Sequence, residues 1–151
     1  MRQLFERLIP ENGYVIGETA CGHEGDINKL EELIDCVSDS QAQIIKFQIF
    51  LPIERATENH PEWQIFNDLA LTKNEWGRAV QYAREKDLII LADIFGDASF
   101  DIAEEIKVDG YKIHSEDLLN TYFIEKVVKT NKIVLIGVGG AHRVEILELL
   151  N

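Results

Sequence analysis

The stretch Ile44-Ile45-Lys46-Phe47-Gln48 decides the fold, because it reads as a strand with apolar residues on both faces. Such strands are typical of parallel sheets that are covered by helices. A second run of this kind, Gly110-Tyr111-Lys112-Ile113, also carries a lysine among apolar neighbours. Because a buried ammonium group is costly unless it meets a negative charge, the two strands indicate a site built for an anion.

Short apolar runs alternate with amphipathic stretches along the rest of the chain. This pattern predicts strands at Tyr14–Glu18, Ile44–Phe50, Leu88–Asp93, Asp109–Ile113 and Lys132–Ile136. It predicts helices from Asp26 to about Ser40, at Lys73–Lys86, Ser99–Lys107 and Leu118–Thr130, and from Ala141 onward, with a long loop from Leu51 to Thr72. Repeated strand–helix units predict an α/β fold with a parallel sheet.

The number of these units limits the choice of fold. About five strand–helix units are present, whereas a closed (β/α)8 barrel needs eight and roughly 250 residues. No Gly-x-Gly-x-x-Gly motif follows the first strand, which argues against a dinucleotide-binding fold. We therefore expect a TIM-barrel type of fold, present as an incomplete barrel. Five strands that close in another way are the alternative.

Composition excludes several classes of partner. The 151 residues carry a formal net charge of −12 without a basic stripe, which argues against nucleic acid and anionic membranes. Cys21 and Cys36 form no Cys-x-x-Cys pair, which is typical of a reducing compartment. The charged N-terminus does not resemble a signal peptide, and no apolar run approaches the ~20 residues of a membrane span. We expect a cytoplasmic protein.

The strand lysines allow three interpretations. Lys46 and Gln48 are two residues apart and share a face, and Lys112 holds a similar place on its strand. They can form a cradle for phosphate or carboxylate. Alternatively, each lysine pairs with Glu18 or Asp93 and fills a barrel interior. A Schiff-base lysine is less favoured, because it needs a lowered pKa that nearby acids would oppose.

Other polar residues near the strand ends also have two possible roles. Glu18 can act as a general base or as a partner for Lys46. Asp117 and Ser115 can cap the helix that follows, and the Ser115 hydroxyl can instead meet an anion. The four histidines show no metal-binding spacing, so we predict no metal site made by this chain alone.

Together these runs resemble the sialic acid synthase family. The resemblance covers the chain from about Tyr14 onward, and five pieces lie in register. The pieces are Gly17-Glu18 with Gly22-His23-Glu24-Gly25-Asp26, Ile45-Lys46-Phe47-Gln48, Leu71-Thr72-Lys73-Asn74-Glu75-Trp76, Asp109-Gly110-Tyr111-Lys112-Ile113, and Ser115-Glu116-Asp117.

The resemblance implies a (β/α)8 barrel that condenses phosphoenolpyruvate with an N-acylmannosamine-type aldehyde sugar to form a nonulosonic acid. It implies a divalent metal, manganese or magnesium, whose ligands lie outside this chain, and a homodimer. The roles it implies are phosphoenolpyruvate binding by Lys46, Lys112 and Ser115, proton transfer by Glu18, sugar contact by Gln48, and an acidic position near the reacting carbons at Asp117.

Three positions depart from the family pattern, and the first is Gly22-His23, which stands where the family has Asn-His. Ala92-Asp93-Ile94-Phe95 stands where the family has Ser-Thr-Pro-Phe, with the threonine on the phosphate. A carboxylate about 4 Å from a phosphate is repulsive by about 1–4 kcal/mol, although Asp93 can instead neutralise Lys112. Gly137-Val138-Gly139 replaces Ser-Thr-Gly and lacks a phosphate-binding hydroxyl.

The family's metal-binding histidines and its C-terminal antifreeze-like domain lie beyond residues 1–151. We therefore expect this chain to be the N-terminal portion of a synthase barrel and to be inactive alone. A non-catalytic sugar-binding or assembly module derived from that barrel is the alternative, with a Schiff-base aldolase as a third possibility.

Overall fold

The computed structural model describes residues 13–149, in which five strands form one parallel sheet. The strands are β1 (Ile16–Ala20), β2 (Ile44–Ile49), β3 (Ile89–Ile94), β4 (Gly110–Ile113) and β5 (Ile133–Ile136). Each strand pairs in parallel with the next one along the chain. Strand order therefore never reverses, as in a barrel and unlike a doubly wound sheet. Within the described residues β1 and β5 are the two edges, so the sheet is open and the predicted incomplete barrel is confirmed.

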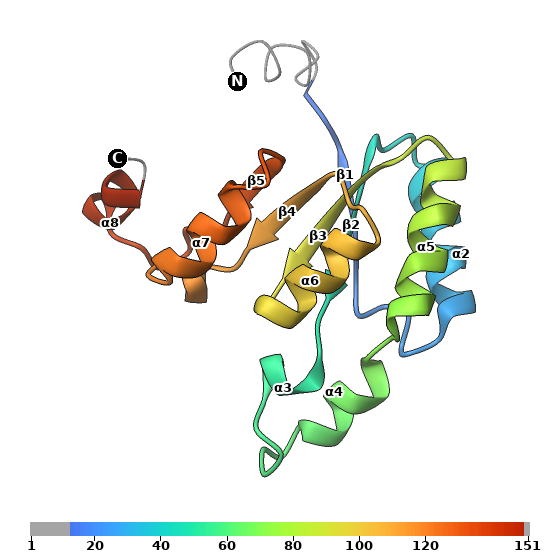
Figure 1. Ribbon diagram of the computed structural model, residues 1–151. Coiled ribbons are helices and arrows are strands. Elements are labelled where there is room, and N and C mark those ends of the chain that lie inside the picture. The colour runs from blue at the N-terminus through green and yellow to red at the C-terminus, as the bar shows by residue number, and fades with distance from the viewer. Residues whose placement is uncertain (1–12, 150–151) are drawn as a thin grey trace.

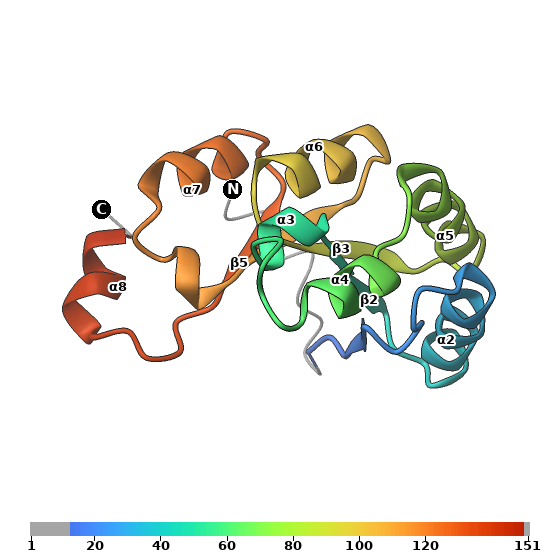
Figure 2. The same cartoon turned by 90° about the horizontal axis from the view of Figure 1, so that it is seen from below.

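Helices follow the strands and form an arc outside the sheet (Figure 2). They are α2 (Ile27–Asp39), α5 (Lys73–Glu85), α6 (Asp97–Glu105), α7 (Thr121–Val128) and α8 (Arg143–Leu149). The Asp26 side chain caps α2 by accepting a hydrogen bond from the Asn28 N–H, and Thr72 with Glu75 forms a capping box at α5. None of the helices in residues 13–149 has the length and apolar character needed to cross a bilayer.

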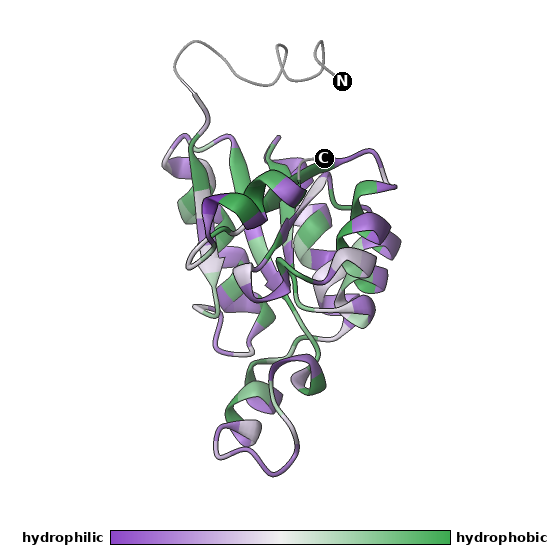
Figure 3. Ribbon diagram, turned by 90° about the vertical axis from the view of Figure 1, so that its left-hand side faces the viewer, coloured by the Kyte–Doolittle hydropathy of each residue, from purple (hydrophilic) through white to green (hydrophobic). Residues whose placement is uncertain are grey.

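The hydrophobic core lies between the sheet and these helices (Figure 3). Phe47 of β2 is fully buried and packs on Trp76 of α5, with ring centroids 5.7 Å apart. Tyr111 of β4 packs in the same way on Phe100 of α6, at 5.4 Å. Since side chains alternate along a strand, the residues on either side of Phe47 and Tyr111 face the inner side of the arc.

The connection between β2 and α5 was predicted as a loop from Leu51 to Thr72, and this prediction was wrong. It contains two short helices, α3 (Pro52–Arg55) and α4 (Trp63–Leu69), which lie beyond the C-terminal ends of the strands (Figure 1). Pro52 suits the first helical turn, where no N–H donor is needed. The Glu54 carboxylate accepts a hydrogen bond from the Leu51 N–H at 3.0 Å and closes this turn.

The helix predicted at Leu118–Thr130 begins later, because α7 starts at Thr121. A 3-10 turn, η1 (Ser115–Asp117), precedes it. The N-cap is Asn120, whose side-chain oxygen accepts a hydrogen bond from the Phe123 N–H. Capping of this helix by Asp117 or Ser115 was therefore a wrong prediction.

We expect Trp76→Ala to reduce the free energy of unfolding by about 3–5 kcal/mol, because it removes a large side chain that is 1% exposed in the core. Tyr122→Ala is the matched control, since Tyr122 is 72% exposed, and it should cost less than about 0.5 kcal/mol. Urea unfolding measures both values. Equal losses in the two variants would contradict the assignment of the core.

His23 stabilises the turn between β1 and α2. Its side chain is fully buried, and Nδ1 accepts a hydrogen bond from the Gly25 N–H at 3.0 Å. The ring meets Trp76 edge-on, with centroids 5.7 Å apart. Burial lowers the pKa of His23, so the folded protein holds this imidazole neutral.

The lowered pKa of His23 makes stability depend on pH. Below about pH 6.5 the His23 side chain of the unfolded protein takes up a proton, whereas that of the folded protein stays neutral. The free energy of unfolding should therefore decrease as the pH is lowered, by up to about 1.4 kcal/mol per pH unit. His23→Gln should flatten this dependence between pH 7.5 and 5.5, whereas His60→Gln, at an exposed position, should not. Identical slopes for the parent and His23→Gln would refute the prediction.

Candidate functional site

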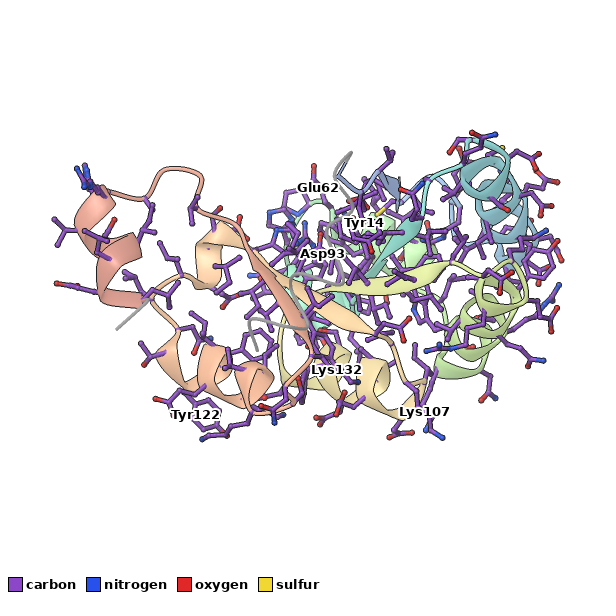
Figure 4. All side chains as sticks on the ribbon, turned by 90° about the horizontal axis from the view of Figure 1, so that it is seen from above. Tyr14, Glu62, Asp93, Lys107, Tyr122 and Lys132 are labelled. Atoms are coloured by element: carbon purple, nitrogen blue, oxygen red, sulfur yellow. The ribbon has the colours of Figure 1, made fainter. Side chains whose placement is uncertain are left out.

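The inner face of the sheet carries a row of polar side chains at its C-terminal end. The strand register places Gln48 of β2 opposite Asp93 of β3, and Asp93 opposite Lys112 of β4. Lys46 lies two residues before Gln48 and therefore on the same face. Figure 4 labels Asp93 among the side chains near the centre of the sheet. Three consecutive strands thus contribute to one site.

Asp93 is the centre of this site. Its carboxylate is fully buried and accepts hydrogen bonds from both lysines. Lys46 Nζ lies 3.2 Å from Oδ2, and Lys112 Nζ lies 3.1 Å from Oδ1 and 2.9 Å from Oδ2. The two ammonium groups therefore converge on one buried point, as their positions on the strands predicted. The neutralisation of Lys112 by Asp93 is also confirmed.

Glu18 supplies a second negative charge to the site. Its carboxylate pairs with Lys46 and also accepts a hydrogen bond from the Ala20 N–H at 3.1 Å. The Glu18 side chain is 40% exposed, so solvent and ligands can reach it, whereas Asp93 is sealed from solvent. Two carboxylates thus face two ammonium groups, and the cluster has no net charge of its own.

His114 belongs to the site, although the sequence analysis gave it no role. Its Nε2 lies 2.7 Å from Asp93 Oδ1, without the angle of a hydrogen bond, and its ring stacks on Phe95 with centroids 4.3 Å apart. Burial lowers the pKa of His114. The carboxylate of Asp93 opposes this effect, and Lys112 makes a smaller contribution in the same direction as burial. Side chains alternate along a strand, so His114, two residues after Lys112, is expected on the same face as Lys112. This alternation could have identified His114 from the sequence.

Gln48 lies beside the end of β1. Its side-chain oxygen accepts a hydrogen bond from the Cys21 thiol at 3.6 Å. Burial raises the pKa of Cys21, so this thiol is a poor candidate for a nucleophile. Gln48 thus places its side-chain amide at the end of the sheet, next to the turn that follows β1.

Ser115 and Asp117 lie in η1, apart from the lysine cluster. No hydrogen bond joins either residue to the lysines in the part of the chain that the structure describes. The Asp117 carboxylate instead accepts a hydrogen bond from the Asn120 side chain at 3.1 Å. The backbone of η1 packs on the end of β5, where a Cβ added to Gly137 would lie 2.9 Å from the Ser115 nitrogen.

The residues present do not fit a metal site. Across residues 13–149, no three His, Cys, Asp or Glu side chains gather in a way that could hold an ion. Asp93 is the most buried carboxylate of the inner face, but two ammonium groups already occupy it and would repel a divalent cation.

Comparison with known proteins identifies the fold and the family. The sialic acid synthetase of Leptospira borgpetersenii superposes with a TM-score of 0.84 at 28% identity, over 91% of this chain and 48% of that one. The N,N'-diacetyllegionaminic acid synthase of Campylobacter jejuni is 26% identical over 91% of this chain and 45% of its own length. The pseudaminic acid synthase of Helicobacter pylori is 25% identical over 91% of this chain and 44% of its own length.

The chain thus spans under half of the length of each of these relatives. The family model that matches it covers residues 33–151, which include the strands that carry both lysines and Asp93. On this evidence the chain belongs to the NeuB family.

Proposed function

We propose that this chain forms the N-terminal part of a barrel that condenses phosphoenolpyruvate with an N-acylmannosamine-type aldehyde sugar to give a nonulosonic acid. The main support is the convergence of Lys46 and Lys112 on one buried point over β3. Membership of the NeuB family and similarity to legionaminic and pseudaminic acid synthases support the same class of reaction. The rest of the barrel, with any metal ligands, would come from residues outside this chain.

The polar residues of the inner face suit the steps of such a condensation. In this reaction C3 of phosphoenolpyruvate bonds to the aldehyde carbon, water adds at C2, and phosphate leaves by C–O cleavage. Lys46 and Lys112 would hold the anionic groups of the donor, and the accessible Glu18 would transfer a proton. Gln48 would contact the sugar. Ser115 and Asp117, which lie in η1 apart from the lysines, would have the roles that the family resemblance implies, near the donor and the reacting carbons.

Asp93 adds a constraint to this proposal. Its carboxylate already neutralises the lysines, so the donor must compete with an anion that belongs to the protein. A second negative group about 4 Å away is repelled by about 1–4 kcal/mol. We therefore infer that Asp93 weakens donor binding and sets its affinity.

Removal of either strand lysine should abolish the reaction. We expect Lys46→Met and Lys112→Met, made in the protein that contains this chain, to lose phosphate release by at least about 100-fold, because each removes a charge that holds the donor. The assay supplies phosphoenolpyruvate, manganese and a panel of N-acylated hexosamines. Lys73→Met is the control, since Lys73 pairs with Glu105 at the surface. Unchanged rates in both lysine variants would reject the assignment.

Neutralisation of Asp93 should tighten donor binding. We expect Asp93→Asn to lower the Kd of phosphoenolpyruvate by about 10-fold or more, because it removes the competing carboxylate while keeping its shape. Isothermal titration calorimetry measures this value. Asp97→Asn changes a surface carboxylate that pairs with Lys126 and should leave the Kd unchanged. Weaker binding in Asp93→Asn would show that the carboxylate supports the donor site instead.

A non-catalytic module is the second candidate, and the ion pairs of Asp93 favour it. In that case the lysines would serve only to neutralise a buried carboxylate and to join three strands. The same calorimetry separates the two functions. Absence of phosphoenolpyruvate binding in both the parent and Asp93→Asn would favour the module.

A further inference from the structure

Arg55 is the last residue of α3, the short helix beyond the C-terminal ends of the strands. Its guanidinium group lies 4.1 Å from the centroid of the Phe95 ring and 5.5 Å from that of Phe66. Phe95 also stacks against His114, so the same ring connects Arg55 to the residues around Asp93. A guanidinium held face-on by an aromatic ring keeps its N–H donors at the edge, where they can meet a ligand.

The position of Arg55 is fixed by its neighbour Glu54. One Glu54 oxygen accepts a hydrogen bond from the Leu51 N–H and the other from the Ser99 N–H, each at 3.0 Å. Glu54 thereby ties α3 to the first turn of α6. A Cβ added to Gly96 would lie 2.6 Å from Glu54 Oε1, so a side chain at this position would displace the Glu54 carboxylate. The turn that carries Arg55 is therefore a built part of the site.

The charge of Arg55 is not compensated in the same way as that of the lysines. Lys46 pairs with Glu18 and Asp93, and Lys112 pairs with Asp93. Arg55 forms no ion pair with a carboxylate within residues 13–149, and its side chain is exposed. Its positive charge nevertheless acts on the inner face, because it contributes to the lowered pKa of His114 and opposes the rise that burial causes in the pKa of Cys21.

We propose that Arg55 is a specificity-determining residue that binds the carboxylate or phosphate of the acidic donor. Its positive charge would compensate for that of the strand lysines, which Asp93 neutralises. This inference rests on the proposed function. An anion that enters from solvent meets the exposed guanidinium first and can form a bidentate pair with it. The donor carries both a carboxylate and a phosphate, whereas the N-acylated sugar acceptor is uncharged, so the donor is the substrate affected.

Calorimetry on the protein that contains this chain tests the role of Arg55. We expect Arg55→Gln to raise the Kd of phosphoenolpyruvate by about 10- to 100-fold and to leave the KM of the sugar unchanged. Arg55→Lys should restore part of the affinity, because it keeps the charge but loses the planar fork. Arg78→Gln is the matched control, since Arg78 pairs with Glu31 on the outer helices.

A double variant separates anion binding from a structural role. If Arg55 replaces charge that Asp93 removes, Arg55→Gln should cost at least about threefold less affinity in the Asp93→Asn background, where the lysines are free to bind. A merely structural role would give equal losses in both backgrounds. An unchanged Kd in Arg55→Gln, with binding in the parent, overturns this inference alone. Absence of binding in the parent and in Asp93→Asn overturns the proposed function as well.

Discussion

The buried carboxylate of Asp93 is the constraint on which the site depends. It lies on the central strand of the described sheet, is fully buried, and binds ammonium groups from the strands on both sides. A carboxylate in this position is tolerable only while it is paired, because an uncompensated buried charge costs several kcal/mol. The contacts of Lys46 and Lys112 with Asp93 therefore link β2, β3 and β4 on the inner face and set the electrostatics of that face.

Such an ion cluster is weak evidence for stability, since well-packed apolar residues of similar volume often stabilise a fold as much or more. The core between sheet and helices already contains large buried groups such as Phe47, Trp76 and Tyr111. The charged residues instead gather at the C-terminal end of the sheet, where barrels bind their ligands. Their position thus points to recognition of an anion, with Asp93 as the counter-charge that sets how strongly the anion is held.

The sequence predicted those features that depend on strand periodicity. Alternation placed Lys46 and Gln48 on one face, with Lys112 in a similar place on its strand, and the same rule could have placed His114 there. The features that were missed depend on local or tertiary contacts. The prolines between Leu51 and Thr72 suggested a loop, so the helices α3 and α4 were not predicted. Asp117 and Asn120 are both suitable N-cap residues, and the sequence did not show that Asn120 caps α7. The position of Arg55 depends on hydrogen bonds from Glu54 to another part of the chain, which no periodicity reveals.

Two of the departures from the family pattern have a common consequence. Asp93 places a negative charge where the family has a hydroxyl, and Gly137 removes a second hydroxyl at the end of β5. Gly137 is also closely packed, because a Cβ there would lie 2.9 Å from the Ser115 nitrogen, so a serine would require the backbone of η1 to shift. With fewer donors on the strands, recognition of an anion must depend more on the loops above them. Arg55 on the rigidly attached α3 is positioned to supply that charge.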